Sequence, residues 1–221
     1  MAFIHPVAVK LCGITRLEDA LRAVELGVRY IGFIFAPQSP RAVTPEQSGA
    51  IIDALPHDVI PVGVFVNAPR DRVLDVFSVS GIKMAQFHGY ESPEYCTSFG
   101  TFPVMKAFRV RPNFGLIDVE PFFCNYYLLD TFDSKQAGGT GKTFDWNLAR
   151  PIAEKYRVML AGGLTPENVV DAVEVVRPYG VDINSGVEER PGIKDHAKLE
   201  QLVRNLEAAG YHSVPAPERS I

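Results

Sequence analysis

The stretches that decide the fold stand near the start of the chain: VAVKLCG at 7–13 and RLEDALRAVELGV at 16–28. The first is a short apolar run with valines, which is typical of a buried strand, and the second repeats apolar residues at helical spacing. A strand followed at once by an amphipathic helix is the unit from which parallel sheets are built. The number of times this unit recurs then decides between an open sheet and a closed barrel.

The unit occurs eight times. The further strands are expected at 30–36, 60–67, 83–89, 103–110, 126–131, 157–163 and 180–186. The further helices are expected at 45–55, 70–81, 92–100, 112–123, 145–156, 166–177 and 195–210. At about 25 residues each, eight units need roughly 200 residues, the low end of the range for a closed barrel. The first turn reads CGIT, without the Gly-rich pattern of many open dinucleotide-binding sheets. We therefore predict an α/β fold, a single-domain (β/α)8 TIM barrel, in preference to an open doubly wound sheet.

Local sequence signals suggest the bounds of this domain and the positions at which two of its helices begin. We expect residues 1–210 to form the barrel domain and residues 211–221 to be a loose C-terminal tail, because the tail is polar and contains prolines. Thr15 with Glu18 predicts a capping box. Thr165 before Pro166 predicts an N-cap followed by proline at the first helical position.

Composition narrows the class of partner. The 221 residues are 47% hydrophobic and 22% charged, as in one globular domain with a sizeable core. A net charge of -4, with Lys and Arg spread along the chain, argues against nucleic acid. No run approaches the roughly 18 apolar residues of a membrane span, so no membrane partner is expected. Self-association stays open between monomer and homodimer.

The three cysteines, Cys12, Cys96 and Cys124, are too scattered for a disulfide framework. The chain also lacks the CxxC and HExxH patterns that would indicate a metal site, so no metal is expected. A reducing compartment fits this cysteine usage, and we expect a cytoplasmic protein. Cys96 and Cys124 are interpreted as core residues.

Cys12 differs because of its place on a strand. In (β/α)8 barrels the active site lies at the C-terminal ends of the strands. Side chains alternate along a strand, so Lys10 and Cys12 share one face while Val9 and Leu11 share the other. The apolar pair should meet the helices, which turns Cys12 into the barrel mouth. A cysteine on a strand is more often a core residue than a catalytic one. Which interpretation holds for Cys12 depends on the other residues at the same end of the barrel.

Other strand ends supply those residues. Asp130 ends the sixth strand, and His88 is inward at the top of the fourth, as is Gln86. Asp182 and Asn184 are expected to point inward on the eighth strand. An aspartate there can simply cap a turn, and a histidine can be structural, but convergence on one mouth makes coincidence the weaker account.

The first and eighth strands of a closed barrel are neighbours, so we expect Lys10 to pair with Asp182 and to favour the Cys12 thiolate. A thiol and a carboxyl on separate walls suit proton removal at one atom and delivery at another. That is the requirement of an isomerase without a redox cofactor, and no cofactor is expected.

Glycines indicate a second subsite. Gly162 and Gly163 lie between the seventh strand and a helix, and Ser185 and Gly186 follow the eighth strand. Loops seven and eight of such barrels commonly bind phosphate through exposed backbone N–H groups. Either loop alone would be read as an ordinary turn. The two together favour a phosphorylated small-molecule substrate.

The segment GGTGKT, at 138–143, ends like a P-loop. It fails as one, because the pattern needs a glycine five residues before Gly141 and Gln136 stands there. We interpret it instead as a loop after the sixth strand, positioned to close over Asp130.

Taken in order, these motifs resemble one family. The segments KLCGIT, SPRAV, GVFVN, AQFHG, LLDT, GGTGKTFDW, LAGGLTPENV and DINSGVEERPGIKD are similar to those of the phosphoribosylanthranilate isomerases of tryptophan biosynthesis, over about residues 7–210. The resemblance implies an Amadori rearrangement with Cys12 as general base and Asp130 as general acid. It also implies that Arg41 faces the anthranilate carboxylate, that Gly162, Gly163, Ser185 and Gly186 hold the phosphate, and that His88 and Asp182 line the substrate pocket.

One departure from the family pattern is visible, and two rivals remain. NSG stands here where members often have SSG, so the side-chain contact of Asn184 is in doubt. A histidine-pathway isomerase acting on a related phosphoribosyl compound typically uses aspartates as both acid and base, and Cys12 argues against it. A non-catalytic phosphate-binding barrel is opposed by the presence of both Cys12 and Asp130.

Overall fold

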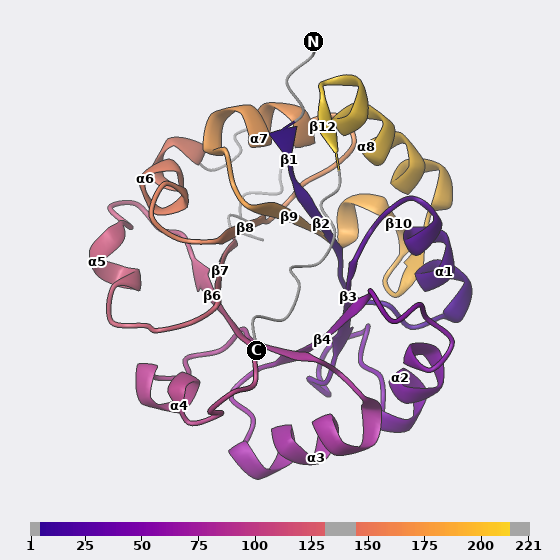
Figure 1. The fold of residues 1–221 in the computed structure, drawn as a ribbon. Coiled ribbons are helices and arrows are strands. Elements are labelled where there is room, and N and C mark those ends of the chain that lie inside the picture. Colours follow the sequence, from indigo (N-terminus) through magenta and orange to yellow (C-terminus); the bar gives the residue numbers. More distant parts are fainter. Residues whose placement is uncertain (1–4, 131–144, 213–221) are drawn as a thin grey trace.

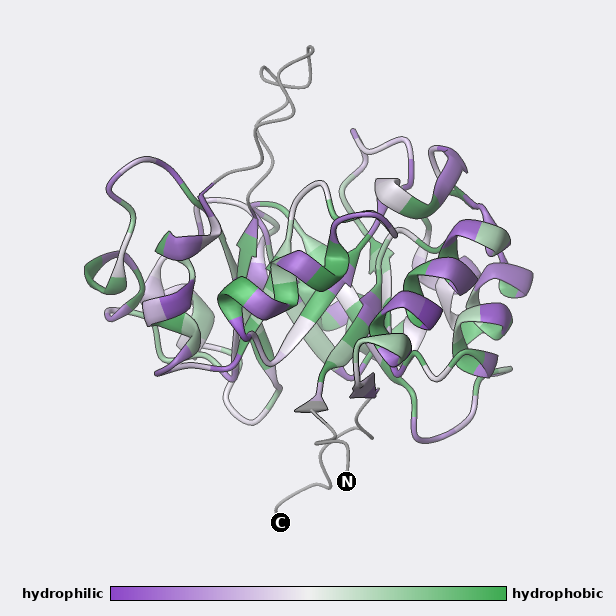
Figure 2. Cartoon of the chain, turned by 90° about the horizontal axis from the view of Figure 1, so that it is seen from above, coloured by the Kyte–Doolittle hydropathy of each residue, from purple (hydrophilic) through white to green (hydrophobic). Residues whose placement is uncertain are grey.

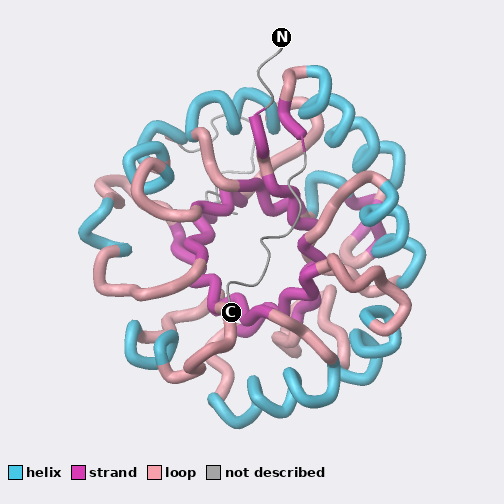
Figure 3. Tube along the Cα trace, viewed as in Figure 1, coloured by secondary structure: helices cyan, strands magenta, loops and turns pink. Residues whose placement is uncertain are grey.

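The structure is a closed barrel of parallel strands surrounded by helices. The computed structural model describes residues 5–130 and 145–212. In these ranges eight strands close on themselves in the order β2, β3, β4, β5, β6, β7, β8, β9. Figures 1 and 3 show the ring of strands inside and the helices outside. The (β/α)8 barrel predicted from the sequence is confirmed.

The barrel strands are β2 (Ala8–Leu11), β3 (Tyr30–Ile34), β4 (Ile60–Phe65), β5 (Met84–Phe87), β6 (Val104–Arg109), β7 (Tyr126–Asp130), β8 (Val158–Ala161) and β9 (Gly180–Ile183). The helices are α1 (Leu17–Glu25), α2 (Pro45–Ile52), α3 (Arg70–Ser80), α4 (Pro93–Thr97), α5 (Leu116–Val119), α6 (Arg150–Ala153), α7 (Val169–Val176) and α8 (His196–Ala208). A short 3-10 turn, η1 (Trp146–Leu148), precedes α6, and a second one, η2 (Ser185–Val187), follows β9. Among the described helices, none is long and apolar enough to cross a membrane.

Two predicted helix starts are wrong, and tertiary contacts explain why. Thr15 does not cap α1, because its hydroxyl donates to the carbonyl oxygen of Gly192 at 2.5 Å. Thr165 opens a turn instead of the helix: its backbone N–H donates to Asn168 Oδ1 at 2.8 Å, and α7 begins only at Val169. The helices expected at 112–123 and 145–156 are likewise shorter than their apolar patterns suggest.

The core has two layers, as side-chain alternation requires. Inside the barrel lie residues such as Ala8, Met84, Met105 and Leu128. Between strands and helices lies the larger cluster, which includes Val9 and Leu11 of β2. In Figure 2 the strands are mostly hydrophobic, and the helices carry both hydrophobic and hydrophilic residues. The predicted faces of β2 are therefore confirmed.

The barrel closes where β2 meets β9. The two strands pair in parallel with Lys10 opposite Asp182 and Leu11 opposite Ile183. Beyond the last pair, the Cys12 N–H donates to the Ile183 carbonyl at 2.8 Å. This closure brings residues from the two ends of the sequence to adjacent positions at the C-terminal edge of the barrel.

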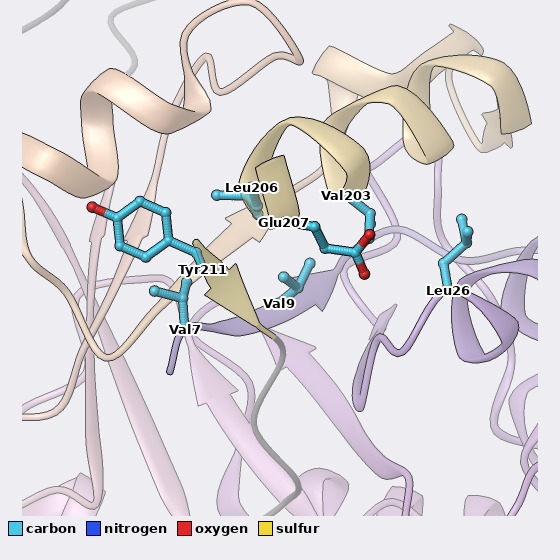
Figure 4. Close-up of a pocket in the computed structure, with 7 residues that line it drawn as sticks. All are labelled: Val7, Val9, Leu26, Val203, Leu206, Glu207 and Tyr211. Carbon is cyan, nitrogen blue, oxygen red and sulfur yellow. The ribbon is translucent and has the colours of Figure 1, made fainter. Parts of the chain in front are cut away.

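The opposite end of the barrel carries two short strands, β1 (His5–Pro6) and β12 (Tyr211–His212), which pair in parallel. Residues 211 and 212 of the expected tail are thus held in a strand by pairing with β1. Tyr211 also borders an apolar recess with Val7, Val9 and Leu206 (Figure 4). Residues 213–221 lie outside the described residues. The recess is at the end of β2 away from Cys12.

Packing of the larger core cluster sets a stability test. Ile31 of β3 is 0% exposed and belongs to that cluster, whereas Ile117 of α5 is 80% exposed. We expect Ile31→Ala to lower the free energy of unfolding by about 2–5 kcal/mol, because it removes buried methyl groups and leaves a cavity. Ile117→Ala is the matched control and should change it by less than about 0.5 kcal/mol. Urea denaturation measures both, and equal effects would contradict this packing.

Candidate active site

A buried ion pair lies under the mouth of the barrel at the β2–β9 seam. Lys10 Nζ lies 2.8 Å from Asp182 Oδ1, and the two side chains are 0% and 7% exposed. Burial alone would lower the pKa of Lys10, but Asp182 and Cys12 together raise it. The ammonium therefore stays charged without contact with solvent. The pairing predicted from the sequence is confirmed.

Cys12 sits directly after β2, beside this pair. Its residue exposure is 4%, so the thiol is shielded from solvent. Burial raises the pKa of the Cys12 thiol, and the nearby cations of Lys10 and Lys194 offset only part of that rise. The sequence-based expectation that Lys10 favours the thiolate is confirmed for this contribution, because Lys10 lowers the pKa of the Cys12 thiol against the effect of burial.

Gly32 of β3 leaves space for the side chains of Cys12 and Lys10. A Cβ at this position would lie 2.9 Å from Cys12 Sγ and 3.1 Å from Lys10 Nζ. Contacts that short would force the thiol or the ammonium to move. Sequence reasoning missed Gly32, although a glycine inside a strand often marks a close approach by another group.

Asp130 and His88 form the other wall. Asp130 is the last residue of β7, and its Oδ2 lies 3.2 Å from His88 Nε2. His88 follows β5, and its Nδ1 lies 3.1 Å from Gln86 Nε2 on the same inward face. Asp182 interacts electrostatically with both His88 and Asp130, which links this wall to the seam. The structure thus brings the predicted Cys12, His88, Asp130 and Asp182 to one mouth.

Arg41 follows β3 and is held by a carboxylate. Its Nε lies 2.8 Å from Glu188 Oε1, and its Nη2 lies 2.6 Å from Glu188 Oε2. Lys194 Nζ donates to the same carboxylate at 3.0 Å. Burial would raise the pKa of Glu188, but Arg41 and Lys194 lower it below its usual range. Two cations therefore share one anion, which leaves an excess of positive charge.

Sequence reasoning missed Glu188 and Lys194. Both lie in the segment NSGVEERPGIKD, whose glycines and serine drew attention instead. Asn184, whose side-chain role was in doubt, accepts from Lys194 Nζ at its Oδ1, 3.0 Å away. A Cβ on Gly13 would lie 2.8 Å from that same oxygen, so Asn184 packs beside the turn that follows Cys12.

The glycine loops after β8 and β9, in which the sequence predicts an anion site, meet in the structure. Gly162 and Gly163 have φ of 90° and 65°, in the left-handed region that glycine adopts readily. A Cβ on Gly186 would lie 1.8 Å from the Leu164 carbonyl oxygen, so η2 packs tightly against the loop after β8. Ser185 opens η2 beside it. The loop predicted at 138–143 lies outside the described residues.

Together these features define a (β/α)8 barrel with a thiol, carboxyl groups, an imidazole and cationic side chains at one mouth. The sequence profile described as N-(5'phosphoribosyl)anthranilate (PRA) isomerase matches residues 9–205. The chain belongs to this family. It catalyses the isomerisation of N-(5'-phosphoribosyl)anthranilate in tryptophan biosynthesis, as the resemblance noted from the sequence implied.

Individual relatives cover nearly the whole chain. The N-(5'-phosphoribosyl)anthranilate isomerase of Geobacter metallireducens is 46% identical over 202 residues, 91% of this chain and 100% of the relative. A phosphoribosyl anthranilate isomerase solved with reduced 1-(o-carboxyphenylamino)-1-deoxyribulose 5-phosphate has a TM-score of 0.79 and 40% identity, and the match covers 91% and 99% of the two chains. Monomers generated from the dimeric Thermotoga maritima enzyme give 0.78 and 41%, with the same coverage.

The raised thiol pKa can be measured through the pH dependence of alkylation. A thiolate is the reactive form, and an ordinary cysteine has a pKa of about 8.5. The alkylation rate of Cys12 by iodoacetamide, resolved by peptide mass spectrometry, should still be rising above about pH 8.5 because burial raises the pKa of this thiol. A plateau below that pH in the wild-type protein would contradict the assignment.

The variant Lys10→Met should move the curve to still higher pH, since it removes a cation that stabilises the thiolate. Lys155→Met is the control, because the Lys155 side chain is 56% exposed and pairs with Glu120. Far-UV circular dichroism checks that both variants fold.

Proposed function

We propose that Asp130 and Cys12 carry out the rearrangement as general acid and general base. Asp130 gives its proton to the ribose ring oxygen, and the C1–O bond breaks to leave a Schiff base with the anthranilate nitrogen. Cys12, as the thiolate, removes the proton at C2 to form an enolamine, which tautomerises to the ketone. The observation that carries this proposal is that both groups stand at strand ends around one mouth, after β2 and at the end of β7.

The base has to lose its proton before it can act. Lys10 and Lys194 each lower the pKa of the Cys12 thiol, against the burial that raises it. Their charges reduce the cost of forming a thiolate on a side chain that is almost fully shielded from solvent. The Lys10–Asp182 pair has a second role in this proposal: Asp182 interacts electrostatically with His88 and Asp130, and we assign it to contact with the substrate.

The anthranilate carboxylate suits Arg41. Glu188 engages the Nε and Nη2 atoms of this guanidinium, which leaves Nη1 outside these hydrogen bonds. The Arg41 side chain is 18% exposed, so it is not fully enclosed by protein. The excess positive charge of Arg41, Glu188 and Lys194 attracts an anion, and a guanidinium binds a planar carboxylate well.

The phosphate group is assigned to the loops after β8 and β9. Gly162, Gly163, Ser185 and Gly186 would bind it through backbone N–H groups, in the position that loops seven and eight have in such barrels. The tight packing of Gly186 on Leu164 supports a single composite site. The substrate would then be anchored at one end while its ribose lies between Cys12 and Asp130.

The cellular location and the oligomeric state of the enzyme are also part of the proposal. We propose that it works in the cytoplasm as a monomer or homodimer and needs no partner beyond its phosphorylated substrate. The Thermotoga maritima relative is described both as dimeric and as generated monomers. Three cysteines that form no disulfide are consistent with a reducing compartment.

The acid and base roles predict two inactive variants. Cys12→Ser replaces the thiol by a far weaker acid of similar size, and Asp130→Asn removes the ionisable proton. We expect each to lower kcat by about 10²- to 10⁴-fold, the contribution of a positioned acid or base. Steady-state assays on N-(5'-phosphoribosyl)anthranilate measure this, with circular dichroism to verify folding. Cys96→Ser is the control for the thiol; near-normal turnover by Cys12→Ser or Asp130→Asn would falsify the roles.

The phosphate site predicts a change in competition by inorganic phosphate. Gly163→Asp places a negative charge in the proposed loop, so the inhibition constant for phosphate and the KM for substrate should both rise, by at least about tenfold. Gly100→Asp is a matched control, because Gly100 also has a positive φ, 63°, and a Cβ there meets nothing within 4 Å. Unchanged competition in Gly163→Asp would move the phosphate site elsewhere.

A further inference from the structure

Gln86 carries a buried polar atom that the described residues leave without a partner. The residue is 1% exposed and lies on the inward face of β5, opposite Val64 of β4 and Met105 of β6. Its Oε1 accepts no hydrogen bond from the described residues, while its Nε2 lies 3.1 Å from His88 Nδ1. A buried amide oxygen without a donor is costly, so such an amide is rarely kept for packing alone.

The contact with His88 fixes which ring nitrogen carries the proton. An amide nitrogen is only a donor, so His88 Nδ1 must accept from Gln86. A neutral imidazole that accepts at Nδ1 carries its hydrogen on Nε2. That Nε2 atom lies 3.2 Å from Asp130 Oδ2. We propose that Gln86 is a positioning residue that locks His88 in the Nε2–H tautomer and so aims an N–H donor at the Asp130 carboxyl.

The opposite orientation of the amide would give a poorer site. If Oε1 faced His88, it would accept from Nδ1–H, and Nε2 would present only a lone pair. Neutral His88 could then not donate to the carboxylate that is left when Asp130 gives up its proton. The amide NH2 would then take the place of the buried oxygen, and its donors would be the atoms without a partner. Of the two orientations, only the one in the structure lets neutral His88 donate a hydrogen bond to Asp130.

The consequence for the reaction rests on the proposed role of Asp130. When Asp130 gives its proton to the ring oxygen, the negative charge stays on its carboxylate. The His88 Nε2–H donates to that carboxylate and stabilises it, and no proton leaves His88. Gln86 acts one step further away, through the tautomer, and has no contact with the reacting atoms in this scheme. Sequence reasoning had placed Gln86 inward without giving it a role.

The tautomer can be read directly by NMR on the ligand-free protein. Two-bond ¹H–¹⁵N correlations of ¹⁵N-histidine-labelled enzyme distinguish the two neutral forms, at about pH 8.5, above the ordinary histidine pKa of about 6.5. The signals of His88 are those that disappear in His88→Asn. We expect the Nε2–H form in the wild-type protein. The Nδ1–H form there would overturn the proposal.

Variants test the cause. Gln86→Met keeps the length of the side chain without its donor and should give a mixture of His88 tautomers. Gln86→Glu offers an acceptor and should shift His88 to the Nδ1–H or doubly protonated form. Gln201→Glu, at an exposed position of α8, is the matched control and should change nothing. A His88 spectrum unchanged in both Gln86→Met and Gln86→Glu would overturn the proposal.

Kinetics supply a second readout that packing alone would not give. Gln86→Met should lower kcat by about tenfold to a hundredfold while KM changes less than threefold, since a hydrogen bond to the developing carboxylate is lost. Failure here is distinguishable from failure of the proposed function. The tautomer of the ligand-free enzyme does not depend on the roles of Cys12 and Asp130, and Cys12→Ser should keep the wild-type His88 spectrum.

Discussion

The ion pair between Lys10 and Asp182 is the interaction on which the rest of the site depends. It lies where the first and last barrel strands pair, and it is almost entirely removed from solvent. Removing one partner of such a pair typically costs about 3–5 kcal/mol, because the other charge is left buried and alone. The ammonium also faces the Cys12 thiol, and the carboxylate also faces His88 and Asp130. The Lys10–Asp182 contact therefore lies at the closure of the barrel and also sets the charges at its mouth.

Around this pair the site is built from charges that cannot all be neutralised locally. Lys10 is matched by Asp182, but Arg41 and Lys194 share Glu188, so positive charge remains for the anions of a substrate. Two opposing effects act on the pKa of the Cys12 thiol: burial raises it, and the cations of Lys10 and Lys194 lower it. Gly32 and Gly186 contribute by having no side chain, since each stands where a Cβ would collide with a neighbour of the site.

Much of this was readable from the sequence because it follows from local rules. The alternation of side chains gave the inward face of β2, and the position of Cys12, His88 and Asp130 at strand ends placed them at one mouth. What escaped were effects decided by contacts far apart in the chain. Glu188 forms hydrogen bonds with Arg41, 147 positions away in the sequence. The Thr15 hydroxyl donates to the carbonyl oxygen of Gly192, 177 positions away, and does not cap its own helix. The net pKa of Cys12 depends on depth of burial, which no spacing reveals.

The central claim is that barrel closure sets a sulfur and a carboxyl on either side of a sugar whose phosphate is anchored by two glycine loops. Its most direct test is a crystal structure of this enzyme with reduced 1-(o-carboxyphenylamino)-1-deoxyribulose 5-phosphate, the compound bound in the solved relative. The account predicts the phosphate against the backbone of Gly163 and Gly186, the carboxyphenyl group toward Arg41, and the ribulose carbons between Cys12 Sγ and Asp130. A phosphate bound elsewhere, or both side chains on the same side of the sugar, would contradict it.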